Sequence, residues 1–202
     1  YFNLTSATTG LPKAYLLTQY SASVLLGGVV SQDVRADDVS LVVFPVFGRV
    51  GFANLLLAIT VGARSVMGNF DAEATLRLIR EESVTVVWLV PTMAALLLQV
   101  PALESHRLDS LRHIGFVGSM LPAALLERAT QRLCPNIYEG YGLQESGMLT
   151  MSTPMDRRRA PDSVGKPVLF AEVRIVDPLG NPVAVGDLGE IVGRSPNCIT
   201  EY

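Results

Sequence analysis

Ten residues near the start of the chain combine hydroxyl side chains with a lysine. The segment from residue 4 to residue 13 reads Leu-Thr-Ser-Ala-Thr-Thr-Gly-Leu-Pro-Lys and ends at Lys13. Hydroxyls and backbone N–H groups in a tight loop donate hydrogen bonds to phosphate oxygens, and an ammonium adds a point charge. The segment lacks the Gly-x-x-x-x-Gly-Lys order of the common phosphate loop. It therefore indicates either a polyphosphate site of another type or an ordinary Ser/Thr-rich turn.

Three further loops carry unusual residues, and each follows an apolar run. They are residues 45–51 (Pro-Val-Phe-Gly-Arg-Val-Gly), 118–122 (Gly-Ser-Met-Leu-Pro) and 140–147 (Gly-Tyr-Gly-Leu-Gln-Glu-Ser-Gly). The runs alternate with helix-like segments, which predicts an α/β fold with a mostly parallel sheet covered by helices on both faces. Ligands of such sheets bind beyond the carboxyl ends of the strands. We therefore expect the loops to share one site.

The patterns between these loops place the individual elements. Thr18 and Asp71 carry side chains that cap helix N-termini, and Pro122 suits a first helical turn. The expected helices cover residues 18–31, 52–60, 71–82, 91–100 and 122–133. The expected strands cover residues 1–5, 40–44, 63–67, 84–90, 111–117 and 136–139.

The sequence changes character after residue 153. Residues 155–162 are polar and are expected to form a loop, in which the consecutive Arg157, Arg158 and Arg159 are solvated. Two alternating strands are expected beyond this loop, with a turn between them. The expected division is an α/β unit over residues 1–155 and an incomplete β-rich unit over residues 156–202.

The composition limits the classes of partner. A net charge of −3 argues against nucleic acid, which requires a basic face. A mean hydropathy of +0.35 suits either a membrane protein or a piece of a larger protein with faces to be covered. The longest apolar run, residues 84–100, is interrupted by Pro91 and is short for a membrane span, so no integral membrane segment is expected. Cys134 and Cys198 are too few for a disulfide framework and suit a reducing cytoplasm.

Taken together, the loops resemble a known family. Residues 5–13 are similar to the phosphate loop of the adenylate-forming, AMP-binding superfamily: acyl-CoA synthetases, luciferases and peptide-synthetase adenylation domains. Residues 45–51, 118–122 and 140–145 resemble its Pro-x-Phe-His-x-x-Gly, Gly-Gly-Ala-Pro-Leu and Gly-Tyr-Gly-Leu-Thr-Glu motifs. Residues 177–194 resemble the stretch before its ribose-binding region. Five motifs in the family order make the chain similar to a central fragment of the large N-terminal domain, nearest to acyl-CoA synthetases.

The resemblance implies a doubly wound subdomain followed by a short piece of a distorted β-barrel. It also implies a reaction in which a carboxylate attacks the α-phosphate of ATP, and a thiol, usually of coenzyme A, then displaces AMP. ATP, Mg²⁺ and CoA are the expected cofactors and co-substrate. The 202 residues alone are expected not to complete adenylation, because other parts of the family's enzymes would lie outside them. A peptide-synthetase adenylation domain and a non-catalytic nucleotide-binding relative are the alternatives.

The resemblance assigns roles to single residues. Lys13, Gln144 and Glu145 are expected to act in catalysis, with Glu145 and Thr5 near the metal, since Mg²⁺ prefers oxygen ligands. Tyr141 is expected along the adenine ring, although outside this context it would be an ordinary core residue. The residues expected to bind the nucleotide are Thr5, Ser6, Ala7, Thr8, Thr9, Gly10, Lys13, Gly118, Ser119, Met120, Glu139, Gly140, Tyr141, Gly142 and Gln144.

Several positions depart from the family pattern. Ala7 stands where the family usually has glycine, and Gly48 where it has a histidine or an aromatic residue. Gln144 replaces a threonine, but its amide can still donate a hydrogen bond. A non-catalytic relative would account for these departures without further assumption.

The pocket for the acid is expected to be mostly apolar. Its expected members are Phe47, Gly48, Arg49, Trp88, Val90 and Met93. This set suits a fatty or aromatic acid. The amino-acid adenylation domains of the family usually carry an aspartate after a phenylalanine in this region, to hold the ammonium group of the substrate. This chain has no aspartate there, which disfavours an amino acid as the substrate. Trp88 could equally be a core residue, and Arg49 is expected to be exposed rather than paired with a second substrate carboxylate. Exposed apolar faces or strand edges could also support a dimer.

Overall fold

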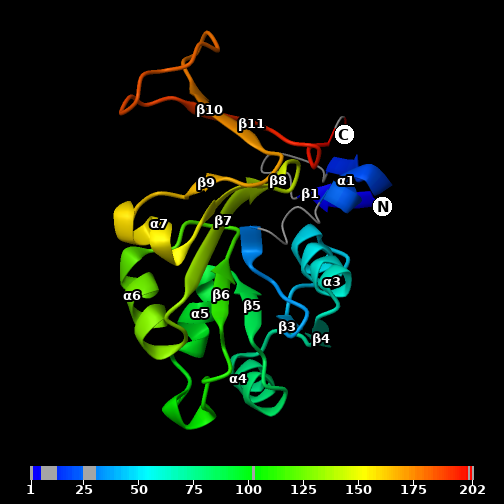
Figure 1. The fold of residues 1–202 in the computed structure, drawn as a ribbon, viewed down its shortest axis with the longest axis vertical. Helices are drawn as coiled ribbons and strands as arrows, with labels where there is room; N and C mark the ends of the chain where they lie inside the picture. The colour runs from blue at the N-terminus through cyan, green and yellow to red at the C-terminus, as the bar shows by residue number, and fades with distance from the viewer. Residues whose placement is uncertain (1, 6–12, 25–30, 102, 200, 202) are drawn as a thin grey trace.

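The computed structural model describes residues 2–5, 13–24, 31–101, 103–199 and 201. Seven strands form one sheet in the order β4-β3-β5-β6-β7-β8-β9, and two hairpins, β1-β2 and β10-β11, stand outside it (Figure 1). The strands are β1 (Phe2–Thr5), β2 (Lys13–Leu16), β3 (Val39–Val42), β4 (Arg64–Met67), β5 (Val86–Leu89), β6 (His113–Phe116), β7 (Ile137–Leu143), β8 (Gly147–Ser152), β9 (Lys166–Pro167), β10 (Glu172–Val176) and β11 (Glu190–Arg194). The helices are α1 (Gln19–Val24), α3 (Arg49–Val61), α4 (Ala72–Glu81), α5 (Pro91–Leu97), α6 (Ala123–Arg132), α7 (Pro154–Arg159) and a 3-10 turn, η2 (Leu103–His106).

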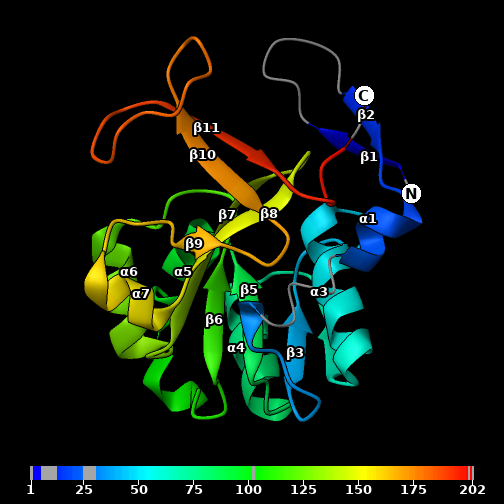
Figure 2. The same ribbon diagram turned by 45° about the horizontal axis from the view of Figure 1, so that its top comes forward.

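The sheet is mostly parallel, which confirms the predicted fold class. β4, β3, β5, β6 and β7 pair in parallel, whereas β8 and β9 are antiparallel additions. The chain passes outward from β3 to β4 and then reverses to reach β5. Because parallel crossovers are right-handed, this reversal puts α3 on the opposite face of the sheet from α4, α5 and α6 (Figure 2). Ligands of open α/β sheets bind at such a reversal, beyond the carboxyl ends of the strands.

Two apolar clusters hold the layers together. The larger one lies on the side of α4, α5 and α6, and includes Leu89, Leu97 and Phe116, each exposed by 1% or less. The smaller cluster lies on the other face and is centred on Trp88, with Val86 and Met151. Alternate residues of β5 therefore point to different clusters, as the two-residue period of a strand requires.

Three elements differ from the prediction. β7 continues through Leu143 and pairs with β8, so residues 140–143 are strand rather than loop. β2 forms at Lys13–Leu16, where no strand was expected. Residues 154–159 form α7, because Thr153 and Asp156 make a capping box at its start. The proposed boundary at residue 155 falls inside this helix and stays a prediction.

A buried histidine lies at the edge of the sheet where the parallel strands begin. His113 is 1% exposed, its ring centroid lies 4.7 Å from that of Tyr138, and neither ring nitrogen has a hydrogen-bond partner within the described part of the chain. Burial, and secondarily the charge of Arg112, lower the pKa of His113 to about 4, although Asp33 and Asp38 oppose the shift.

We expect this histidine to make the protein sensitive to acid. An unfolded histidine has a pKa of about 6.5, so the unfolded chain takes up this proton before the folded protein does. The contribution of neutral His113 to the free energy of unfolding is therefore fully present above about pH 6.5 and is lost as the pH falls toward 4. The loss between pH 7 and pH 5 is about 2 kcal/mol. Urea unfolding of wild type and His113→Leu at both pH values checks this. The wild type should lose about 2 kcal/mol more than the variant, and an equal loss in both would contradict the assignment.

Candidate active site

A cavity of about 390 Å³ opens between α3 and the ends of the strands. Its wall combines residues 49–57 of α3, Trp88 of β5, the residues that follow β6 and the turn that joins β7 to β8. The lining residues are Gln32, Arg49, Val50, Ala53, Asn54, Leu57, Trp88, Val117, Gly118, Gly140, Tyr141, Gly142, Leu143, Gln144, Glu145, Gly147 and Met148. Parts of three predicted loops thus meet at one site, at the carboxyl ends of the strands.

The N-terminal hairpin lies against this site. Thr5 and Lys13, which lie at the two ends of the hydroxyl-rich segment in the sequence, are paired directly across β1 and β2. Tyr15 of β2 is 1% exposed, and its hydroxyl donates to Oε1 of Gln144 at 3.2 Å. Burial raises the pKa of Tyr15, which keeps this donor protonated, while Arg49 opposes the shift. Lys13 lies two residues earlier on the same strand and is exposed.

The predicted phosphate-binding residues between the two strands lie outside the described residues. These are Ser6, Ala7, Thr8, Thr9 and Gly10. Their roles stay predictions, and so does the metal-binding role of Thr5.

The turn between β7 and β8 is built by close backbone contacts. A Cβ atom on Gly142 would lie 1.9 Å from the carbonyl oxygen of Gly147, so only glycine fits there. Ser146 is buried and accepts a hydrogen bond from the N–H of Leu143 at 3.1 Å. This shape presents Gln144 and Glu145 at the rim of the cavity.

Arg49 departs from the sequence-based expectation. It was expected to be exposed, but it is 4% exposed and lines the cavity. One terminal nitrogen donates to the backbone carbonyl of Gln144, and the other donates to that of Asn197 at 2.7 Å. Both partners lie far from Arg49 in the sequence, so no local pattern could reveal the contact.

Glu139 and Arg157 form a buried ion pair next to the site. Their side chains are 8% and 9% exposed, respectively. The other carboxylate oxygen of Glu139 accepts from the backbone N–H of Leu121 at 3.0 Å. This bond fixes the end of the turn that starts at Gly118. The prediction that Arg157 is solvated is wrong, because α7 directs this arginine toward β7; Arg158 and Arg159 are exposed as expected.

The structure brings some of the predicted acid-pocket residues together and separates others. Arg49 and Trp88 line the cavity, whereas Phe47, Gly48, Val90 and Met93 are not among its lining residues. Phe47 is 80% exposed. Met93 packs against the cluster on the opposite face of the sheet.

Sequence reasoning missed Ala53, Asn54 and Leu57 in the part of the cavity that α3 supplies. Val50, Ala53, Asn54 and Leu57 line it, at the spacing of one helical face. Asn54 is 8% exposed and its Nδ2 has no hydrogen-bond partner among the described residues. The same holds for Nε1 of Trp88, which is 3% exposed. The cavity is thus mainly apolar, with two buried neutral donors in the side chains of its wall.

The other positions expected at the nucleotide lie around the rim of the cavity. Gly118, Gly140, Tyr141 and Gly142 line it. Ser119 and Met120 are exposed on the turn after β6, and Met120 is 81% exposed.

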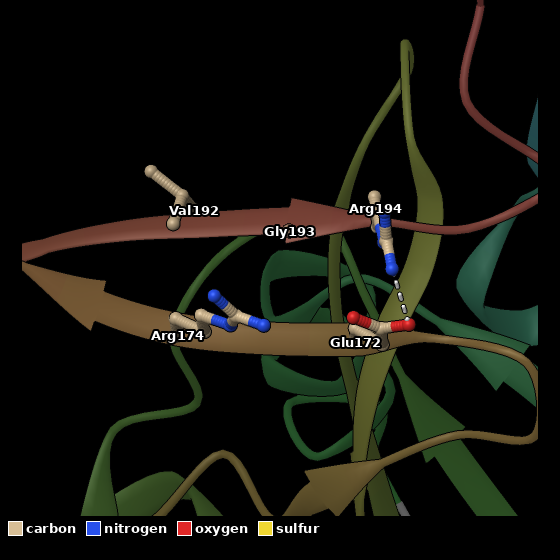
Figure 3. A pocket seen from close by; sticks show the side chains of 5 residues that line it. All are labelled: Glu172, Arg174, Val192, Gly193 and Arg194. Carbon is tan, nitrogen blue, oxygen red and sulfur yellow. Dashed lines mark hydrogen bonds and ion pairs between the residues drawn. The ribbon is translucent and has the colours of Figure 1, made fainter. Parts of the chain in front are cut away.

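A second hollow lies on the β10-β11 hairpin and is lined by Glu172, Arg174, Val192, Gly193 and Arg194 (Figure 3). Arg194 forms an exposed ion pair with Glu172 at 2.8 Å. Nearby turns expose Leu179, Val185 and Leu188 almost completely. The predicted role of such apolar faces in a dimer, and the predicted barrel fragment, stay predictions.

The sequence and the fold both match known proteins. The family model for the AMP-binding enzyme matches residues 1–202. The chain belongs to the AMP-binding enzyme family. This confirms the resemblance on which the sequence-based expectations rest.

Three similar proteins illustrate the match. Feruloyl-CoA synthase from an Amycolatopsis species is 34% identical over 209 residues, which cover 98% of this chain and 41% of the relative. Indoleacetate–CoA ligase from Aromatoleum aromaticum is 33% identical, with 98% and 39% covered. O-succinylbenzoate coenzyme A synthetase from Bacillus subtilis, solved in complex with ATP and magnesium ion, is 25% identical with a TM-score of 0.86, and 100% and 42% are covered. The chain therefore spans about two fifths of the length of these relatives.

Two further observations concern cations and membranes. Over the described ranges, no group of three or more His, Cys, Asp or Glu side chains is placed to hold a metal ion. Of the helices in the described part of the chain, none has both the length and the apolar character that a bilayer crossing requires.

Proposed function

We propose that this chain binds Mg²⁺–ATP at the cavity, within a protein that activates a carboxylic acid as an acyl adenylate and transfers the acyl group to CoA. The observation that carries the proposal is the contact of Tyr15 with Gln144. It joins the strand that carries Lys13 to the turn that carries Glu145, which supports a shared role of these two residues at one nucleotide. The names of the relatives, which are CoA ligases and synthetases of carboxylic acids, support the reaction.

In this proposal, each charged or polar group has a distinct role. Lys13 stabilises the charge that develops on the departing pyrophosphate, through electrostatics rather than proton transfer. Tyr15 occupies the Oε1 of Gln144, so the amide N–H groups of Gln144 remain to donate to the α-phosphate. The threonine that the family usually carries there is thus replaced by another donor, which favours an active protein over a non-catalytic relative.

The donor set around the turn suits a magnesium ion that arrives with ATP. Mg²⁺ prefers one or two carboxylates together with phosphate oxygens and water, not a full protein cage. Glu145 at the cavity rim is the carboxylate that would hold it. When bound, the ion neutralises phosphate charge. Tyr141 and Gly118 would flank the adenine ring, and backbone can approach closely at Gly118 because it has no side chain.

The remaining wall is proposed to hold the acid. Val50, Ala53, Leu57 and Trp88 provide an apolar surface that a fatty or aromatic acid can bury. The feruloyl, indoleacetate and chlorobenzoate ligases among the relatives favour the aromatic class.

The two lysines of the chain provide a matched test of nucleotide binding. Lys13→Ala should weaken Mg²⁺–ATP binding about tenfold or more, because a charge-assisted contact to phosphate is lost. Lys166→Ala should bind like the wild type, since Lys166 is 72% exposed and pairs with Asp156. Isothermal titration calorimetry measures both. Equal affinities for the wild type and Lys13→Ala, or no binding by the wild type, would reject the proposal.

A further inference from the structure

We propose that Arg49 is a positioning residue that fixes the Gln144–Glu145 turn against α3, so that the acid wall and the nucleotide turn behave as one unit. The inference rests on the proposed function and adds to it. It assigns to Arg49 neither contact with the nucleotide nor recognition of a second substrate carboxylate.

The hydrogen bonds of Arg49 support this role. Its side chain reaches from the first residue of α3 to the carbonyl of Gln144 and to that of Asn197. A guanidinium is a planar fork of fixed donors, so it can bond two carbonyl groups at once. Both terminal nitrogens are thereby used on backbone rather than directed to a ligand.

The turn is also shaped to receive the guanidinium. Gly147 has a φ of +68°, and a Cβ atom there would lie 2.7 Å from the Nη2 of Arg49. A side chain at this position would strain the backbone and push the guanidinium away. The glycine that closes the turn and the arginine that holds it therefore fit each other.

Other bonds also hold the turn. The N–H of Ile199 donates to the carbonyl of Glu145 at 2.8 Å, and the hydroxyl of Ser195 donates to that of Ser146 at 3.3 Å. Arg49 bonds the turn and this same segment, through Asn197. Three parts of the chain that are distant in sequence are thus joined beside the cavity.

The position of Arg49 is not explained by the stability of α3. A positive charge in the first turn of a helix is unfavourable, because the helix N-terminus is itself positive. The N-cap residue, Gly48, contributes no side-chain capping bond either. The arginine therefore serves a contact outside its own helix.

This arrangement predicts that the two ends of the cavity are coupled. Val50, Ala53 and Leu57 follow Arg49 on α3 and form the proposed acid wall. An acid that packs against them also orders the helix start that holds Gln144. Binding of the acid and of ATP should then strengthen each other, and the effect must be reciprocal.

Calorimetric titration of the wild type, Arg49→Lys and Arg49→Met with Mg²⁺–ATP tests the inference. We expect about a tenfold loss of affinity for Arg49→Met and a smaller loss for Arg49→Lys, which keeps a charged donor but lacks the planar fork of the guanidinium. Ethylguanidinium should restore binding to Arg49→Ala, an effect that general destabilisation would not give. Arg64→Met is the control, because Arg64 is half exposed and pairs with Glu82.

The outcomes separate the two proposals. If the wild type does not bind Mg²⁺–ATP, the proposed function fails. If the wild type binds and both Arg49→Met and Arg49→Lys match it, or if Arg64→Met loses as much as Arg49→Met, only the role of Arg49 is rejected. If Arg49→Met does not fold, the lysine variant decides: reduced affinity at an unchanged melting temperature supports the role, and wild-type affinity overturns it.

Discussion

Replacing Arg157 by methionine is expected to lower the free energy of unfolding by about 3–5 kcal/mol, since the carboxylate of Glu139 would remain buried without its cation. Urea unfolding at pH 7 measures the loss. Arg158→Met is a matched control, because this neighbour is exposed and should change stability by about 0.5 kcal/mol or less.

A second substitution tests whether the buried charge is the cause. In the double variant Glu139→Gln/Arg157→Met, the glutamine oxygen can still accept from the N–H of Leu121, and both charges of this buried pair are removed. Most of the lost stability should return. If the double variant is as unstable as Arg157→Met alone, the loss comes from the packing of the arginine stem instead.

Gly142→Ala is expected to be equally severe and to act on the site itself. The added Cβ would meet the carbonyl carbon and oxygen of Gly147, which are backbone atoms that cannot rotate away. We expect a destabilisation of about 3 kcal/mol, from forced separation of β7 and β8. The affinity for Mg²⁺–ATP should fall about tenfold or more, because Gln144 and Glu145 lie in the turn that these strands hold.

The control for this substitution is a glycine that faces a flexible neighbour. A Cβ atom on Gly68 would lie 3.1 Å from Cδ1 of Leu78, the end of a side chain that can shift. Gly68→Ala should therefore cost less than about 1.5 kcal/mol and leave ATP affinity unchanged. Wild-type stability and affinity in Gly142→Ala would show that the turn is not held by this contact.

The fold could be predicted from sequence where local pattern and burial agree. Strands such as β5 are continuous runs of buried β-branched and aromatic residues, which is typical of the interior of a parallel sheet. Helix N-caps were predictable for the same reason, because they depend on residues that are close in the sequence. Asp71 accepts a hydrogen bond from the N–H of Ala74, as predicted for the start of α4. The prediction failed at residues 140–143, because Gly140 and Gly142 read as turn residues. Their lack of a side chain instead permits the close approach of β8.

The candidate site was predictable in its parts but not in its connections. The motif residues Tyr141, Gln144 and Glu145 do line one cavity with Gly118. The contacts that organise them join residues 18 to 148 positions apart, as between Glu139 and Arg157 or Arg49 and Asn197. A run of arginines resembles a solvated surface until the partner is known. Only the three-dimensional structure shows which arginine is buried.

The central claim is that the N-terminal hairpin and the turn between β7 and β8 bind the same nucleotide. A double-mutant cycle for Mg²⁺–ATP affinity, with Lys13→Ala, Glu145→Gln and the pair combined, tests it most directly. We predict that the pair loses less affinity than the sum of the single losses, with a coupling of about 1 kcal/mol, because both groups act on one polyphosphate and its metal. Strict additivity, or full affinity in either single variant, would contradict the account.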